Sequence, residues 1–255
     1  MKGPRLPLWR VPILMYHRVS ATEPSPADYF FTLSRRRFAQ QMHSLHREGF
    51  TVIPLDQVLD WLEHGCRLPR RPVAITFDDG YAETYRLAVP VLERFGFPAT
   101  FFLVSDHLGG RTSWESSTRD AGHRVLGWEE ARSLVRRGFT VGSHTRSHPV
   151  LPQLDDARLY EELAGSRQVL EARLGVPVRL LAYPRNRCDA RCQAAARDAG
   201  YRGACAGDGQ AYHPFCLDRV DVTHASPRLF RAKLSPWFHA FRRLRFRILG
   251  PLGHR

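Results

Sequence analysis

Four helix-like segments of this chain end in a glycine that an aromatic residue and an apolar run follow at once. The four junctions read REGF at 47–50, RFGF at 94–97, RRGF at 136–139 and DAGY at 198–201. Glycine commonly ends a helix, because it adopts the left-handed backbone conformation without steric cost. Helix, glycine turn and short apolar strand, repeated along a chain, predict β/α units around a parallel sheet. The chain is therefore expected to belong to the α/β class.

The same alternation defines the expected elements. Strands are expected at 12–16, 50–53, 72–77, 99–104, 139–143, 178–183, 201–205 and 217–222. Helices are expected at 36–48, 55–64, 83–95, 128–137, 156–174 and 189–199. A length of 255 residues is ordinary for a single α/β barrel. We expect one domain over 11–225, with a basic lead-in at 1–10 and a basic tail at 226–255.

The formal net charge of +13 is concentrated at the two ends of the chain. Residues 1–10 carry three basic residues, residues 226–255 carry seven Arg and one Lys, and neither segment contains an acid. The ends therefore hold eleven of these charges, and the body between them is nearly neutral. Because no nucleic-acid recognition motif accompanies the basic residues, we expect no nucleic-acid partner.

Residues 235–250, SPWFHAFRRLRFRILG, have the pattern of a helix with Ser at the N-cap and Pro at the first position. Arginines alternate with an apolar stripe made of Trp237, Phe241, Leu244 and Ile248. Two interpretations are open at this point. The segment is a terminal helix packed on the barrel, or a helix lying on an anionic membrane surface.

The N-terminal residues and the cysteines indicate the compartment. The apolar run near the N-terminus is short and is interrupted by Arg10 and prolines, which does not fit a signal peptide. The five cysteines are odd in number and loosely spaced, so a reduced compartment is expected, and we interpret Cys188 and Cys192 as ordinary thiols. No stretch approaches the ~20 apolar residues of a membrane span. We expect a cytoplasmic protein, peripheral on the inner face of the membrane if the tail binds there.

Polar side chains follow several of the expected strands. Asp78 and Asp79 come directly after one strand, His144 follows another, Tyr183 ends a third and His17 ends the first. Adjacent carboxylates repel, and each is costly to desolvate unless positive charge lies close by. In α/β barrels active sites lie at the C-terminal ends of the strands. The pattern therefore predicts one polar site at this end of the barrel.

The segment GSHTRSHP places His144 and His148 four residues apart. On one helical turn this spacing would put both imidazoles on the same face, where they can grip one ion. Two neutral nitrogens and one carboxylate form a three-ligand Zn²⁺ site with an open position for water. Asp79 can supply that carboxylate and leave Asp78 beside the water as a general base.

These motifs resemble the signature motifs of a known family. TFDDG and SHTRSH are similar to the first two motifs of polysaccharide deacetylases, the NodB-homology group of carbohydrate esterase family four, and the resemblance covers about residues 11–225. It implies an irregular (β/α)₇ barrel and a bound Zn²⁺, or another divalent ion such as Co²⁺, Ni²⁺ or Mn²⁺. By the same resemblance Asp78 is the catalytic base, and the metal ligands are Asp79, His144 and His148.

Two further segments extend the resemblance. AYPRN is similar to the third motif, whose tyrosine N–H stabilises the oxyanion, and this implies that role for Tyr183. Asn186 stands where the motif usually has glycine, and asparagine tolerates the left-handed backbone. PILMYHRV resembles the branch that deacetylates poly-N-acetylglucosamine, in which the histidine of this motif is the catalytic acid, and this implies His17. The alternative is that His224 is the acid and that His17 is a strand-end histidine bonded to backbone.

Arg219, in LDRV, lies on a late strand where this branch often has an arginine. Two interpretations of Arg219 are open: it pairs with Asp78 and keeps the base ionised, or it is a surface arginine. Taken together, the motifs imply an enzyme that removes N-acetyl groups from amino sugars of a polysaccharide or lipid-linked glycan. The other hypotheses are a deformylase of a lipid-linked amino sugar, and a non-catalytic relative that binds glycan or membrane. Oligomeric state is not predicted.

Overall fold

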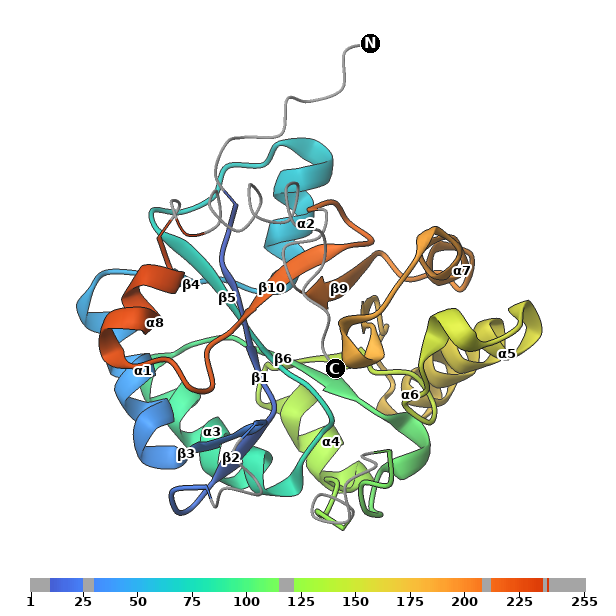
Figure 1. Ribbon diagram of the computed structural model, residues 1–255, viewed down its shortest axis with the longest axis horizontal. Helices are drawn as coiled ribbons and strands as arrows, with labels where there is room; N and C mark the ends of the chain where they lie inside the picture. Colours follow the sequence, from blue (N-terminus) through green and yellow to red (C-terminus); the bar gives the residue numbers. More distant parts are fainter. Residues whose placement is uncertain (1–9, 25–29, 115–121, 208–211, 236–237, 239–255) are drawn as a thin grey trace.

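The structure, a computed structural model, describes residues 10–24, 30–114, 122–207, 212–235 and 238. Seven strands form a closed ring in which all neighbours run parallel (Figure 1). In ring order they are β1 (Ile13–Tyr16), β10 (Leu217–Asp221), β9 (Gly203–Gly207), β8 (Leu180–Ala182), β7 (Thr140–Ser143), β6 (Thr100–Leu103) and β5 (Pro72–Phe77). Pairing of β1 with β5, where Tyr16 lies opposite Phe77, closes the ring. The predicted (β/α)₇ barrel is confirmed.

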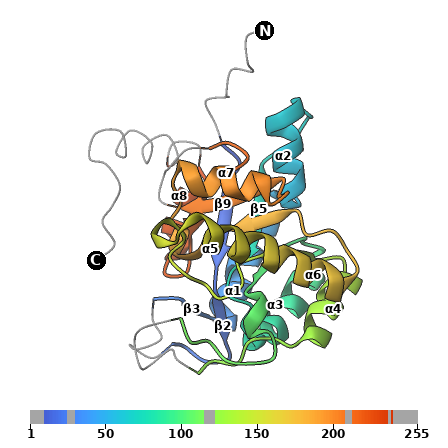
Figure 2. The ribbon, with the colours of Figure 1, turned by 90° about the vertical axis from the view of Figure 1, so that its right-hand side faces the viewer.

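Helices surround this ring (Figures 1 and 2). They are α1 (Arg35–Arg47), α2 (Leu55–His64), α3 (Ala82–Phe95), α4 (Trp128–Arg136), α5 (Asp156–Tyr160), α6 (Ser166–Leu174), α7 (Ala190–Asp198) and α8 (Pro227–Lys233). A π-helical turn, Glu161–Gly165, joins α5 to α6, so the helix predicted at 156–174 is continuous and irregular in its middle. Short 3₁₀ turns lie at Ser105–His107, Leu151–Gln153 and Pro184–Asn186.

The ring strands are mostly apolar, as expected of strands covered on both faces, although β10 also carries Asp218, Arg219 and Asp221. Every residue of β5, β6 and β9 is buried, between the ring interior and the helices. The glycines of the four helix–strand junctions all have the left-handed backbone expected of them, with φ of 70° at Gly49, 65° at Gly96, 81° at Gly138 and 84° at Gly200. The polar rim of the barrel therefore rests on two clusters of buried apolar side chains.

Some elements differ from the sequence-based expectation. Strands β2 (Arg18–Ser20) and β3 (Thr32–Ser34) form a separate parallel pair, and β4 (Thr51–Val52) pairs with the first residues of β5. Strand β9 begins and ends two residues later than predicted, because Cys205, Ala206 and Gly207 pair with β10. These strands are only two to five residues long, and the hydrophobic period is poorly defined over such lengths.

The C-terminal part of the described chain continues past residue 225. Helix α8 lies beyond this predicted domain boundary, and its Phe230 is buried in the core. Of the segment 235–250 only Ser235 and Phe238 are described, and Phe238 is half-buried against the core. The apolar stripe predicted there lies outside the described residues. Among the described helices none is long and apolar enough to cross a membrane.

Candidate active site

The residues predicted from the strand ends come together at the C-terminal end of the barrel. Asp78 and Asp79 directly follow β5, and His144 directly follows β7. His17 follows β1, and Arg219 lies in the middle of β10. Parallel strands end at the same rim, so residues far apart in the sequence become neighbours.

Asp79, His144 and His148 form a buried cluster whose ligand atoms all lie within 4.8 Å of one another. Asp79 Oδ1 is 3.4 Å from Nε2 of His144 and 3.5 Å from Nε2 of His148. His144 Nδ1 donates to the carbonyl of Ala182 at 2.7 Å, which fixes the tautomer and leaves Nε2 as the ligand atom. Asp79 Oδ1 is buried and has no hydrogen-bond partner among the described residues. One oxygen and two nitrogens facing a shared point fit a divalent metal ion.

The two histidines are not on a helix, so the predicted helical turn is wrong. They lie in the loop after β7, in which Thr145 and His148 have left-handed backbones with φ of 68° and 63°. The buried carboxylate of Glu162 accepts the backbone N–H groups of Arg146 and Ser147, both at 2.9 Å. Glu162 belongs to the π-helical turn. That irregular turn therefore supports the loop that carries both ligands.

The Asp-Asp-Gly turn is equally constrained. Asp79 has a φ of 68°, a left-handed conformation that few residues other than glycine adopt. Gly80 follows with the same φ, and a Cβ there would lie 3.0 Å from Leu103 Cδ2. The turn points the two adjacent carboxylates to different partners, Asp79 to the imidazoles and Asp78 to Arg219.

Arg219 and Asp78 form a fully buried bidentate ion pair. Nη1 lies 2.6 Å from Oδ1 and Nη2 lies 2.7 Å from Oδ2, so the predicted pairing is confirmed. The remaining guanidinium N–H groups donate to oxygens of Ala206, Thr76 and Asn186. Burial opposes ionisation of Asp78, but Arg219, His144 and His17 outweigh it and lower its pKa below the ordinary value.

Asn186 contributes to this network in a way that the sequence did not reveal. Its φ of 55° confirms that asparagine adopts the left-handed turn where the motif usually has glycine. Its Oδ1 accepts from Arg219 Nη2 at 2.9 Å. The one signal in the sequence was the replacement of the motif glycine by a residue with an amide side chain.

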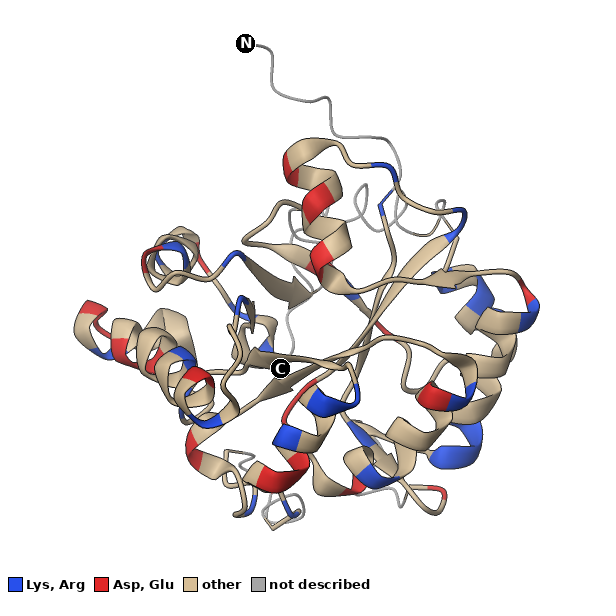
Figure 3. Cartoon of the chain, turned by 180° about the vertical axis from the view of Figure 1, so that it is seen from behind, with Lys and Arg blue, Asp and Glu red and all other residues tan. Residues whose placement is uncertain are grey.

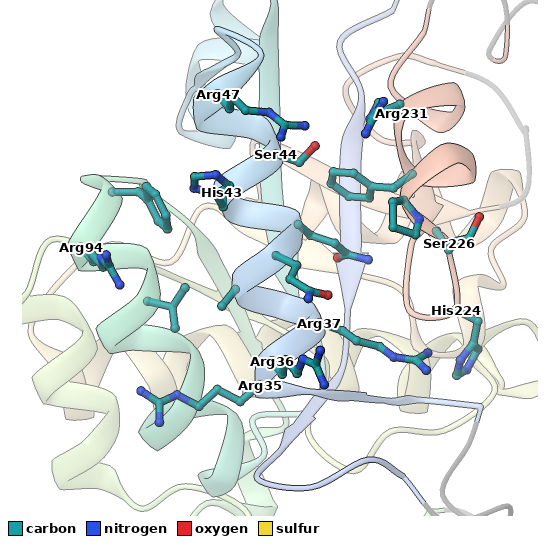
Figure 4. Close-up of a pocket in the computed structure, with 18 of the residues that line it drawn as sticks. Arg35, Arg36, Arg37, His43, Ser44, Arg47, Arg94, His224, Ser226 and Arg231 are labelled. Carbon is teal, nitrogen blue, oxygen red and sulfur yellow. The ribbon is translucent and has the colours of Figure 1, made fainter.

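His17 lies beside the base. Its Nε2 is 3.8 Å from Asp78 Oδ2, and its ring contacts Phe31 with centroids 5.1 Å apart. Its buried Nδ1 has no hydrogen-bond partner among the described residues, so no backbone bond holds the ring there. His224, the alternative acid, lines a groove between α1 and α8 instead (Figure 4).

The structure contradicts the role predicted for Tyr183. Its backbone N–H donates to the carbonyl of Cys205 at 3.0 Å, and its hydroxyl donates to the carbonyl of Phe215 at 3.1 Å. Both donors are engaged in the barrel. Tyr183 is therefore a buried support of β8, and its N–H cannot also bind an oxyanion.

Trp114 is a further residue at the site that sequence reasoning missed. Its ring stacks on His148 with centroids 4.9 Å apart and an interplanar angle of 26°. A single tryptophan in a long loop carries no motif, so nothing in the sequence connected it with the histidines.

The two imidazoles are electrostatically different. Burial and the nearby His144 lower the pKa of His148 to about 3. Burial also disfavours a charged His144, but Asp79 and Asp78 outweigh it and raise the pKa of His144. The carboxylates thus favour a proton on His144, and a bound metal would compete with that proton.

Comparison with known proteins agrees with this geometry. Residues 66–204 match the family described as polysaccharide deacetylase. YxkH of Bacillus subtilis is 26% identical over 227 residues, which cover 89% of this chain and 72% of that protein. The poly-beta-1,6-N-acetyl-D-glucosamine N-deacetylase of Staphylococcus epidermidis is 30% identical over 106 residues, which cover 38% of this chain and 36% of that enzyme.

A solved structure is similar over nearly the whole barrel. IcaB from Ammonifex degensii superposes with a TM-score of 0.74 at 26% identity, covering 91% of this chain and 97% of that one. The family match extends over more than half of the 255 residues. The chain belongs to the polysaccharide deacetylase family and is a hydrolase that acts on amide bonds.

Proposed function

We propose that this enzyme is a metal-dependent N-deacetylase that removes acetyl groups from a poly-N-acetylglucosamine type of glycan. The observation that carries the proposal is the buried triad Asp79, His144 and His148 with the ion-paired Asp78 beside it. The name of the Staphylococcus epidermidis relative supports this class of substrate. The similarity covers 106 residues, which are about a third of that enzyme's length.

The triad would hold the metal through one carboxylate oxygen and two imidazole nitrogens, a donor set that suits Zn²⁺ and also Co²⁺, Ni²⁺ or Mn²⁺. A divalent cation supplies Lewis-acid chemistry, in that it polarises an amide carbonyl and makes water easier to ionise. The chain contributes the proton transfers and the orientation of the groups.

Asp78 is the general base in this proposal. Arg219 holds the carboxylate in one orientation and keeps it ionised, so it is ready to take a proton from the attacking water. Each carboxylate oxygen has a second lone-pair site, so the ion pair leaves it able to accept that proton. Arg219 acts as a positioning residue.

His17 is the general acid in this proposal. An amide nitrogen leaves poorly until it is protonated, and the imidazole lies at the rim beside Asp78. Because Tyr183 is engaged in the barrel, we assign the backbone oxyanion contact to the next N–H along the turn. That group belongs to Arg185, since Pro184 has none.

Mass spectrometry of short β-1,6-linked N-acetylglucosamine oligomers incubated with the metal-loaded protein tests this function. We expect loss of acetyl groups and release of acetate, and neither product with Asp78→Asn. N-formylated glycans, including a lipid-linked amino sugar, serve as the parallel substrates. Turnover of the formylated substrates alone would identify a deformylase and overturn the proposal.

We further propose that the enzyme works in the cytoplasm at the inner face of the membrane, with 235–250 on the anionic lipid surface. The support is the sequence, in which Arg242, Arg243, Arg245 and Arg247 alternate with apolar residues. Changing these four arginines to glutamine in the full chain should weaken binding to anionic vesicles. Unchanged binding would contradict this role of the segment.

A further inference from the structure

A large groove runs along the outside of the barrel, between α1, α3 and α8, and it belongs to no part of the catalytic site (Figure 4). Its volume is about 1180 Å³. We call it the arginine groove, because six arginines line it: Arg35, Arg36, Arg37, Arg47, Arg94 and Arg231. No acidic residue is among its lining residues.

The positive charge of the arginine groove is only partly compensated. Arg37 lies 3.1 Å from Glu23, and Arg231 lies 3.1 Å from Glu48. Arg35, Arg36 and Arg94 are exposed and form no ion pair with any residue in the described part of the chain. Helix α1 carries four arginines and no acid, whereas α5 and α6 carry both signs of charge; Figure 3 colours the charged residues along the ribbon. Three uncompensated guanidinium groups in one groove attract an anion.

Part of the groove lining is apolar. It includes Val91 and Phe95 of α3, Ala39 of α1 and Phe230 of α8, beside polar side chains such as Gln40 and Ser44. A phosphorylated sugar or an inorganic polyanion would leave these side chains without a complementary group. An amphiphile with a phosphate head and a hydrocarbon chain complements both parts of the surface.

The chain's own terminal segments do not complement the groove. Residues 239–255 follow α8 in the sequence and carry five arginines and no acid, and residues 1–9 also contain no acid. Like charges would repel these segments from the arginines. A negatively charged occupant must therefore come from outside these segments.

We propose that the arginine groove binds the phosphate groups of anionic phospholipids and docks this side of the barrel on an anionic bilayer. Guanidinium groups bind phosphate oxygens in bidentate fashion, and the apolar part of the lining would accommodate the upper part of an acyl chain. The site is independent of the segment 235–250, although α8 leads directly into that segment.

Docking in this way would place the active site close to the bilayer surface. Helix α1 begins at Arg35, directly after β3, and Phe31, the residue before β3, contacts His17. The arginine groove thus begins a few residues from the proposed catalytic acid. This consequence rests on the proposed function, since it brings the deacetylase site to glycans held at the membrane.

Vesicle binding by the full chain tests the proposal. The groove variant carries Arg35→Gln, Arg36→Gln and Arg94→Gln. The matched control carries Arg136→Gln, Arg158→Gln and Arg179→Gln, three exposed arginines that also form no ion pair with described residues and lie outside the groove. Both variants lose the same charge. Co-sedimentation is measured with phosphatidylcholine vesicles that contain or lack phosphatidylglycerol.

We expect the groove variant to bind anionic vesicles about a hundredfold more weakly than wild type at low salt, from the loss of three basic residues at the surface. The control should lose less than tenfold, and neutral vesicles should bind none of the proteins. Equal losses in the two variants would overturn the proposal. Tight binding of soluble inositol hexakisphosphate, lost only in the groove variant while vesicle binding is unchanged, would also overturn it.

Two further measurements keep these outcomes separate from folding and catalysis. Equal thermal midpoints for the three proteins establish that they are folded. Acetate release from short soluble oligomers reports the proposed function alone. A wild-type protein without that activity would contradict the deacetylase proposal and leave the vesicle result intact.

Discussion

Arg219 binds both carboxylate oxygens of Asp78, with Nη1 2.6 Å from Oδ1 and Nη2 2.7 Å from Oδ2, and both residues are buried. A buried carboxylate would favour its protonated form without a cation beside it. The pair therefore decides whether Asp78 can act as a base at all. It also fixes the plane of the carboxylate relative to the neighbouring triad.

Replacing Arg219 with glutamine should raise the pKa of Asp78, because burial remains and the largest opposing charge is removed. A base is active when ionised, so the acid limb of the pH profile of kcat/KM should move to higher pH. Arg219→Lys keeps a charge but loses the bidentate geometry, and it should shift the limb less. Both variants should lose activity, by up to about a hundredfold for a displaced reacting group.

Metal content and thermal midpoint are the controls for this comparison. Both variants should retain the metal, since the guanidinium donates to Asp78, Asn186, Thr76 and Ala206, none of which belongs to the triad. An unmoved acid limb in Arg219→Gln, with the metal retained, would show that Asp78 is not the titrating base.

Substitutions of Asp78 and of Asp79 should have different effects on metal binding and turnover. Asp78→Asn should keep the metal and lose turnover, because an amide cannot accept the proton. Asp79→Asn should lose both, because the buried Oδ1 between the imidazoles is the ligand atom. Metal analysis and acetate release on the same preparations measure the two effects. Full activity in Asp78→Asn would show that another residue is the general base.

Metal binding should release a proton, and the two histidines should differ in this respect. The carboxylates raise the pKa of His144, so of the two imidazoles it is the one that more readily holds a proton in the metal-free state. The pKa of His148 is lowered to about 3, so this ring is already neutral near pH 7. Affinity should therefore fall as the pH falls through the pKa of His144, by up to about tenfold per unit for one proton.

Calorimetric titration with Zn²⁺ in two buffers of different ionisation enthalpy counts the released protons. We expect about one Zn²⁺ per chain. His144→Ala and His148→Ala should both bind far more weakly, and the proton release should be missing only in His144→Ala. Unchanged metal content in both variants would refute the assigned triad.

The sequence predicted the barrel well because its signals are local. Each glycine junction marks the end of a helix and the start of a strand. The long helices and buried strands also have local hydrophobic patterns of their own. Elements without such a signal were missed, among them the three-residue strands β2 and β3 and the helix α8.

The sequence predicted which residues form the site better than it predicted how they are arranged. Spacing suggested a helix for His144 and His148, whereas a loop with two left-handed residues, supported by Glu162, brings them together. A motif cannot show that a neighbouring strand already binds the N–H of Tyr183. Contacts between distant segments, such as Trp114 on His148, depend on tertiary packing and leave no local pattern.

His17→Ala should bind metal normally and hydrolyse amides more slowly, by ~10²–10⁴-fold for the loss of one acid catalyst. An ester with a good leaving group needs no protonation, so the rate of its hydrolysis should fall much less. The ratio of amide to ester turnover is the measurement. His224→Ala is the matched control and should leave this ratio unchanged. Equal losses on both substrates would indicate a structural role for His17.

The contact between Asn186 and Gly207 provides a test of how the turn after β8 is held. A Cβ added to Gly207 would lie 2.7 Å from Asn186 Cγ and 2.9 Å from its Nδ2, so Gly207→Ala must displace this side chain. Because Asn186 Oδ1 accepts from Arg219, the displacement should reduce turnover as well as stability. Overpacking of this kind costs about 1–3 kcal/mol of unfolding free energy.

The double variant decides whether this contact is the cause. Asn186→Gly suits the φ of 55° and removes the three atoms nearest to the added Cβ, while it gives up the bond to Arg219. Gly207→Ala should therefore destabilise the wild type by more than it destabilises Asn186→Gly. Denaturant unfolding of the four proteins yields the coupling free energy, expected between about 0.5 and 3 kcal/mol for residues in contact. A coupling near zero would mean that the alanine strains the barrel through other neighbours, and that Asn186 is free to remain on Arg219.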